Sequence, residues 1–79
     1  MVVDDQSTSR AILEQVVRSL DERVAVEGFV RPVDAVVWAT RHVADLVLVD
    51  YMMPDMDGIE FVRRLRALPG YEHVPMVMV

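Results

Sequence analysis

Three aspartates in this sequence are spaced so that they could share one cation. Asp4 and Asp5 follow a short apolar stretch at the start of the chain, and Asp50 follows the apolar run 46–49. Crowded carboxylates do not all stay ionised unless a proton or a cation compensates them. Three hard oxygen donors in a partly open site suit Mg²⁺, which keeps several waters and takes few protein ligands. If the two strand ends are neighbours, the aspartates predict a magnesium site.

A carboxylate beside a bound cation can also act as a nucleophile. The cation offsets the repulsion between an incoming phosphate and the carboxylate, and aspartate forms aspartyl phosphates in some ATPases. Pro54 and Gly58 follow Asp50 in the sequence "LVLVDYMMPDMDG". Proline fixes one backbone dihedral, and glycine permits a tight start of the next helix. We therefore interpret Asp50 as a carboxylate that a strand end holds rigidly and leaves open to solvent.

Apolar strands and amphipathic helices alternate along the chain. Strands are expected at 1–5, 24–27, 44–50 and 74–79, and helices within 7–20, 32–40 and 58–68. Ser7 or Thr8 is the expected N-cap of the first helix, and Pro32 the expected first residue of the second. This order predicts an α/β fold, an open parallel sheet with helices on both faces and right-handed crossovers. Because function gathers at the carboxyl ends of parallel strands, the aspartates should meet there.

The spacing of apolar residues predicts which side of each helix is buried. The expected core residues are Ile12, Leu13, Val16, Val17 and Leu20 in the first helix, Val33, Val36 and Val37 in the second, and Ile59, Val62 and Leu65 in the third. Further core residues are expected to be Trp38, Met52, Met53, Met56, Met76 and Met78, with Met53 and Met56 also padding their loop. The residues expected at the surface are Arg63, Arg64, Arg66, His42 and His73.

Composition narrows the class of protein. The chain has 79 residues, which allows one domain at most, and it has no cysteine, so it has neither disulfides nor thiolate metal sites. A net charge of −5 argues against direct binding of nucleic acid, which needs clustered cations. No run approaches eighteen apolar residues and no secretion signal is visible. These features predict a cytoplasmic domain that binds neither nucleic acid nor membrane by itself.

The stretches "VVDD" at 2–5 and "LVLVDYMMPDMDG" at 46–58 resemble the receiver domain of two-component response regulators. The resemblance extends in spacing over 1–79. It implies the flavodoxin-like strand order 2-1-3-4-5. It also implies that Asp50 is the phosphoacceptor and that Mg²⁺ is bound by Asp5, Asp50 and the backbone carbonyl of Met52, with Asp4 acting through water or hydrogen bonds.

The resemblance also implies partners. A histidine kinase or a phosphotransfer domain would supply the phosphoryl group and contact the first helix, which carries Arg10, Ile12, Leu13 and Glu14 near its start. An output region, in the same chain or in a partner, would read the result, and homodimer formation is left open. The domain would then be a signalling module and not an enzyme.

The sequence departs from the receiver pattern at its end. Receivers carry a serine or threonine about thirty residues after the phosphoacceptor and a lysine on a fifth strand, and both positions fall after Val79. We therefore expect 1–79 to be a partial receiver that lacks the last strand and the last two helices, so that the apolar stretch 74–79 forms an aggregation-prone edge. A pseudo-receiver, a protein-interaction module of the same fold that is never phosphorylated, stays open as an alternative.

Other interpretations of the acidic loop fit less well. An EF-hand with Gly58 at its sixth position would have Met53 at the first and Arg64 at the twelfth, so both key acids fail. A haloacid-dehalogenase-type phosphatase needs a second acid two residues after its nucleophile, where this chain has Met52. An aspartate-based phosphatase would be revealed by turnover of an external phosphoester. The alternative without a functional site is that Asp4, Asp5 and Asp50 are three solvated acids at strand ends.

Overall fold

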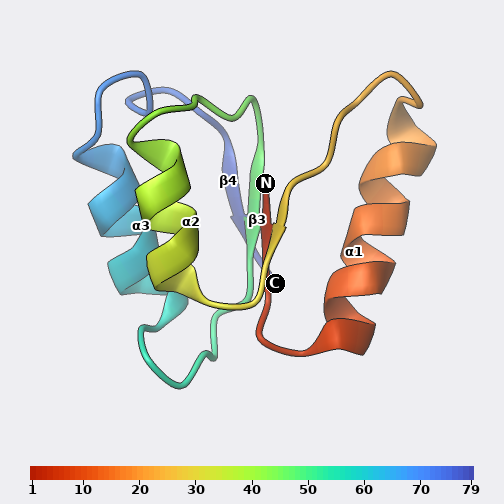
Figure 1. The fold of residues 1–79 in the computed structure, drawn as a ribbon, viewed down its shortest axis with the longest axis horizontal. Helices are drawn as coiled ribbons and strands as arrows, with labels where there is room; N and C mark the ends of the chain where they lie inside the picture. The colour runs from red at the N-terminus through yellow and green to blue at the C-terminus, as the bar shows by residue number, and fades with distance from the viewer.

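The computed structural model describes residues 1–79 and contains one four-stranded sheet with three helices. The elements are β1 (Val2–Val3), α1 (Ser7–Leu20), β2 (Gly28–Phe29), α2 (Pro32–Ala39), β3 (Val47–Val49), α3 (Gly58–Arg66) and β4 (Met76–Met78). All strand pairs are parallel and the order is β2-β1-β3-β4, with β4 at one edge. The helix α1 lies on one side of the sheet, and α2 and α3 lie on the other (Figure 1). The predicted open parallel sheet is confirmed.

The first helix occupies the predicted span but begins differently. Its N-cap is Gln6, in an extended conformation and without a side-chain capping bond, so the predicted cap at Ser7 or Thr8 is wrong. None of its residues is fully buried. Leu13 and Val17 are half-buried, whereas the remaining predicted core residues, Ile12, Val16 and Leu20, are exposed. No helix of the structure has the length and apolar character that crossing a membrane requires.

The second strand lies further along the chain than the valine-rich pattern predicts. β2 pairs with β1 through Gly28 and Phe29, whereas the predicted strand 24–27 lies before it. The carboxylate of Glu14 on α1 lies directly over Gly28, where an added Cβ would come within 2.9 Å of Oε1. An alanine at this position would therefore require the flexible end of the Glu14 side chain to move.

The second helix begins at Pro32 as predicted, but it is rotated relative to the predicted face. Its buried residues are Pro32, Ala35 and Ala39, while Val33 and Val37 are exposed. A helix that is apolar nearly all round does not fix its own rotation, because several faces satisfy the helical period. The two alanines let α2 lie close to its neighbours, and that closeness decided the face.

The third helix is also rotated by about one position from the predicted face. Phe61 and Leu65 are fully buried, Val62 is half-buried and Ile59 is exposed. Arg63 and Arg64 are exposed as predicted and pair with Glu60 on the same helix.

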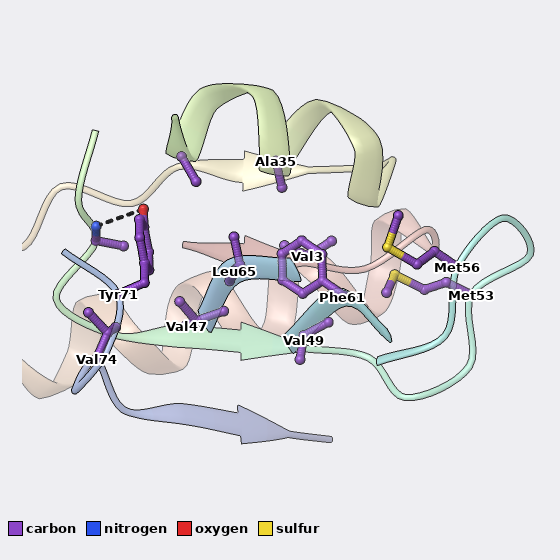
Figure 2. Packing of buried hydrophobic residues seen from close by; sticks show 12 residues of the cluster. Val3, Ala35, Val47, Val49, Met53, Met56, Phe61, Leu65, Tyr71 and Val74 are labelled. Carbon is purple, nitrogen blue, oxygen red and sulfur yellow. Dashed lines mark hydrogen bonds between the residues drawn. The ribbon is translucent and has the colours of Figure 1, made fainter. Parts of the chain in front are cut away.

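The core lies between the sheet and the pair α2 and α3 (Figure 2). Val3, Val47 and Val49 point from the strands toward Phe61 and Leu65, and all five are fully buried. Among the methionines, Met53 and Met56 are buried at the loop end of this core as predicted, and Met76 is half-buried against it. Met52 and Met78 are exposed, so the prediction that they fill the core is wrong.

Trp38 at the end of α2 packs against other aromatic rings. Trp38 stacks on His42 with ring centroids 4.5 Å apart and lies 5.9 Å from Phe29. Its predicted packing role is confirmed, and both His42 and His73 are at the surface as predicted.

A polar tie between two loops was not predicted from the sequence. Tyr71, in the connection between α3 and β4, is fully buried. Its hydroxyl donates to the carbonyl of His42 at 2.7 Å and accepts the N–H of Ala44 at 3.1 Å, the dashed line in Figure 2. Arg66 is exposed as predicted, and its guanidinium also donates to the carbonyls of Tyr71 and Val74, both at 2.8 Å. These bonds fix the connection from α3 to β4, at the end of the sheet away from the aspartates.

Candidate functional site

The pairing of β1 with β3 brings the three aspartates together. Asp50 N–H donates to the carbonyl of Val3 at 2.9 Å, and Asp4 N–H donates to the carbonyl of Phe29 at 3.1 Å. Asp4, Asp5 and Asp50 each offer a carboxylate oxygen, and these oxygens lie within 4.8 Å of one another. The expectation that the two strand ends are neighbours is therefore confirmed.

The two adjacent aspartates differ in environment. Asp4 is only 3% exposed, and its Oδ1 accepts the N–H of Gln6 at 2.9 Å. Asp5 is half-buried, and its carboxylate accepts no hydrogen bond within the chain. The pair therefore combines one buried acid, Asp4, with one acid, Asp5, that lines the opening to solvent.

Asp50 is held at one of its two carboxylate oxygens. Oδ1 accepts the N–H of Met52 at 3.2 Å, which closes a short turn directly after β3. The residue is half-buried, and its other carboxylate oxygen accepts no hydrogen bond within the chain. The backbone of Asp50 belongs to the sheet while its side chain stands at the sheet's edge, which matches the interpretation of a rigidly held, open carboxylate.

A shallow hollow of about 370 Å³ opens beside the cluster. It is lined by Asp5, Tyr51, Met52, Met53, Pro54 and Asp57. Met53 is buried beneath it, whereas Met52 is 75% exposed and stands at its rim. The loop after β3 therefore gives the aspartates a partly apolar approach from solvent.

The end of this loop is fixed by an aspartate and a glycine. Asp57 caps α3 by accepting the N–H of Glu60 at 2.8 Å, a role that its position three residues before an acid could have indicated. Gly58 follows with an ordinary backbone conformation, but an added Cβ would lie 3.0 Å from both the carbonyl oxygen of Asp50 and Cα of Tyr51. Glycine is required here because two backbone segments approach closely, and not because of an unusual dihedral.

The donor set of the cluster fits a hard divalent cation. None of the five ion pairs in the structure includes any of the three aspartates, so no side-chain cation compensates their charge. Three oxygen donors beside an opening to solvent match the way Mg²⁺ binds, through a few carboxylates and several waters. The carbonyl of Met52 stays a predicted ligand, because the structure assigns a partner only to its N–H.

The chain is similar in sequence to a known family and to known proteins. A family model described as the response regulator receiver domain matches residues 1–79. The chain is 40% identical to the cyclic di-GMP phosphodiesterase response regulator RpfG of Xanthomonas campestris, a match that covers the whole chain and 21% of that protein. It is 33% identical to the chemotaxis protein CheY homolog of Campylobacter jejuni, covering the whole chain and 61% of that protein.

A solved structure has the same arrangement of elements. The chemotaxis response regulator CheY4 of Vibrio cholerae matches with a TM-score of 0.87 and 27% sequence identity, covering 98% of this chain and 62% of that one. The chain therefore spans less than two thirds of the length of each of these three proteins.

Proposed function

The chain belongs to the response regulator receiver domain family, and from that premise we propose that Asp50 accepts a phosphoryl group from a phosphohistidine, with Mg²⁺ bound beside it. The observation that carries the proposal is the convergence of three carboxylates within 4.8 Å at the open end of the sheet. A histidine kinase or a phosphotransfer domain would carry the phosphohistidine. Receiver domains of this family act as signalling modules, so the chain would transmit its phosphorylation state to an output region and would not turn over a substrate.

The environments of the aspartates support distinct roles. Asp5 and Asp50 are both half-buried, and Asp5 lines the hollow; both would bind Mg²⁺ directly together with the carbonyl of Met52. Asp4 is buried and already accepts a hydrogen bond from Gln6, so it would act through water or hydrogen bonds. When bound, the cation supplies positive charge that offsets the repulsion between phosphoryl oxygens and carboxylates.

The proposed transfer uses the free oxygen of Asp50. The N–H of Met52 restrains Oδ1, so the other carboxylate oxygen is free to attack phosphorus in line with the bond to the histidine nitrogen. The new O–P bond forms an acyl phosphate as the P–N bond breaks, and the electron pair of that bond stays on the imidazole. The loop after β3 would approach the donor through the exposed side chains of Tyr51 and Met52.

The acyl phosphate would then shift a conformational equilibrium that an output region reads, in the same chain or in a partner. RpfG, whose name describes a cyclic di-GMP phosphodiesterase, is about five times as long as the stretch that matches this chain, as the 21% coverage implies. The absence of cysteine suits a reducing compartment, and we propose that the module works in the cytoplasm.

The first prediction is that the full-length protein is phosphorylated at Asp50. Incubation with acetyl phosphate and Mg²⁺ should add one phosphoryl group, and mass spectrometry should locate it on this residue. Asp50→Asn should abolish labelling because the amide is a poor nucleophile. Asp55→Asn, an exposed acid of the same loop outside the cluster, is the matched control and should label normally.

Labelling that persists in Asp50→Asn would refute the assignment of the phosphoacceptor. A wild-type protein that is folded, takes no label from acetyl phosphate or a phosphohistidine donor, and still binds a partner would favour the pseudo-receiver.

The second prediction is that Mg²⁺ affinity depends more on Asp5 than on Asp4. Asp5→Asn should abolish the response to Mg²⁺ in an NMR or fluorescence titration, because a direct ligand is lost. Asp4→Asn should weaken it by about 10–100-fold, the range for groups that orient a direct ligand. A larger loss in Asp4→Asn than in Asp5→Asn would show that the two roles are reversed.

A further inference from the structure

The peptide group that joins Asp4 to Asp5 is held by an arginine of α1. Arg10 Nη1 donates to the backbone carbonyl oxygen of Asp4 at 3.0 Å in a partly buried contact. Arg10 is the only cationic side chain that bonds any of the three aspartates, and it bonds the backbone and not a carboxylate.

Arg10 also contacts Glu14, one turn further along α1. Its Nε lies 4.0 Å from Oε2 of Glu14, and only 20% of each of the two side chains is exposed. The carboxylate of Glu14 in turn lies over the backbone of Gly28, the residue of β2 that pairs with Val2. A continuous set of contacts therefore runs from β2 through Glu14 and Arg10 to the start of the acidic pair.

The backbone around Asp4 has its other polar groups satisfied as well. Its N–H bonds the carbonyl of Phe29, and its side chain accepts the N–H of Gln6. The carbonyl of Asp4 and the N–H of Asp5 belong to one planar peptide group. Fixing that carbonyl therefore fixes the plane from which the side chain of Asp5 departs toward the hollow.

We propose that Arg10 is a positioning residue that orients the Asp4–Asp5 peptide group and thereby aims the carboxylate of Asp5 at the cation. The metal-binding half of this inference rests on the proposed function. The sign of one effect separates positioning from simple electrostatics. A guanidinium beside three carboxylates repels a cation. If Arg10 acted only through its charge, the wild-type protein would bind Mg²⁺ more weakly than a variant with a neutral residue at this position. If Arg10 positions the peptide group, the neutral replacement should instead bind Mg²⁺ more weakly than the wild-type protein.

The test compares Mg²⁺ titrations of the full-length wild-type protein with Arg10→Met and Arg10→Lys. Arg10→Met should weaken Mg²⁺ binding about tenfold, the lower end of the range for groups that orient a ligand. Arg10→Lys keeps the charge and can still donate once, so it should restore part of the affinity. Arg18→Met is the matched control, because Arg18 pairs with the same Glu14 at 3.9 Å but does not contact Asp4. The Mg²⁺ affinity of Arg18→Met should equal that of the wild type.

Gly28→Ala probes the same contacts from the other end. Its new Cβ would meet the mobile end of Glu14 at 2.9 Å, and Gly28 has no positive φ, so the fold should tolerate the change while Glu14 and Arg10 move. A weaker effect in the same direction as Arg10→Met is expected. Mg²⁺ binding that is unchanged or tighter in folded Arg10→Met would overturn the proposal.

A metal-free measurement keeps this inference separate from the proposed function. The NMR signals of the Asp4 carbonyl carbon and the Asp5 amide should move in metal-free Arg10→Met and stay in place in Arg18→Met. If the wild type binds no Mg²⁺ and takes no phosphoryl group, the proposed function fails, whereas these signals still decide whether Arg10 orients the peptide group. Signals of Asp4 and Asp5 that do not move would refute the role of Arg10.

Discussion

The two faces of the sheet are covered to very different extents. On the face toward α2 and α3, Val47 and Val49 of β3 are fully buried. On the face toward α1, Leu48 of the same strand is only half-buried, and its neighbour Val77 on β4 is 48% exposed. All four residues are apolar and lie in one sheet, so the residue type did not decide their burial. The number of helices above each face decided it.

The same contrast separates the helices themselves. α3 buries Phe61 and Leu65 completely, whereas α1, the longest helix, buries no residue completely and leaves Leu20 at its C-terminal end 75% exposed. A fully buried tyrosine, Tyr71, also joins two loops beside the covered face through hydrogen bonds of its hydroxyl. The acidic site therefore lies at the end of a sheet with one well-packed face and one face that is covered over β1 but partly uncovered over β3 and β4 within residues 1–79.

The largest effect is expected when residues 1–79 are expressed alone. The uncovered face and the apolar edge strand β4 should cause aggregation or association, because total stability is only about 5–15 kcal/mol and each covered valine or methionine contributes about 1.5–3 kcal/mol. Analytical ultracentrifugation and thermal melting would check this. A soluble monomer with a cooperative melt would show that one covered face suffices.

The next largest effect is expected from truncating a side chain on the covered face. Phe61→Ala in the full-length protein should reduce the free energy of unfolding of this domain by about 3–5 kcal/mol, because it leaves a cavity beside Val3 and Val49. Ile12→Ala on α1 should reduce it by only about 0.5 kcal/mol, as is usual for exposed positions. Urea denaturation measures both. Equal losses would show that a segment outside residues 1–79 covers α1.

A smaller effect should follow from removing the polar tie of the covered face. Tyr71→Phe deletes a buried hydroxyl and leaves the N–H of Ala44 and the carbonyl of His42 without their partner, at a cost of about 1–3 kcal/mol in the free energy of unfolding. Tyr51→Phe is the matched control, because the exposed hydroxyl of Tyr51 makes no hydrogen bond within the chain. If both variants unfold at the same urea concentration, the tie does not contribute to the difference between the faces.

Several secondary-structure elements and the place of the aspartates could be predicted from the sequence, because the local residue types determine them. A continuous apolar run that ends at Asp50 predicts a buried strand with a carboxylate at its end, and Pro32 predicts the first turn of a helix by its fixed dihedral. The alternation of strands and helices predicts a parallel sheet, which in turn brings Asp4 and Asp5 to Asp50. These conclusions need only the order of elements and the geometry of parallel pairing.

Other features were decided only by contacts between distant segments. β2 forms where Gly28 and Phe29 pair with β1, and the need for glycine at position 58 depends on the backbone of Asp50 and Tyr51. The rotation of α2 was open because valines surround most of the helix, and close packing selected Ala35 and Ala39. The burial of Tyr71 required a partner loop about thirty residues earlier in the chain. Periodicity describes one element at a time, so it cannot report which neighbour each face of that element will meet.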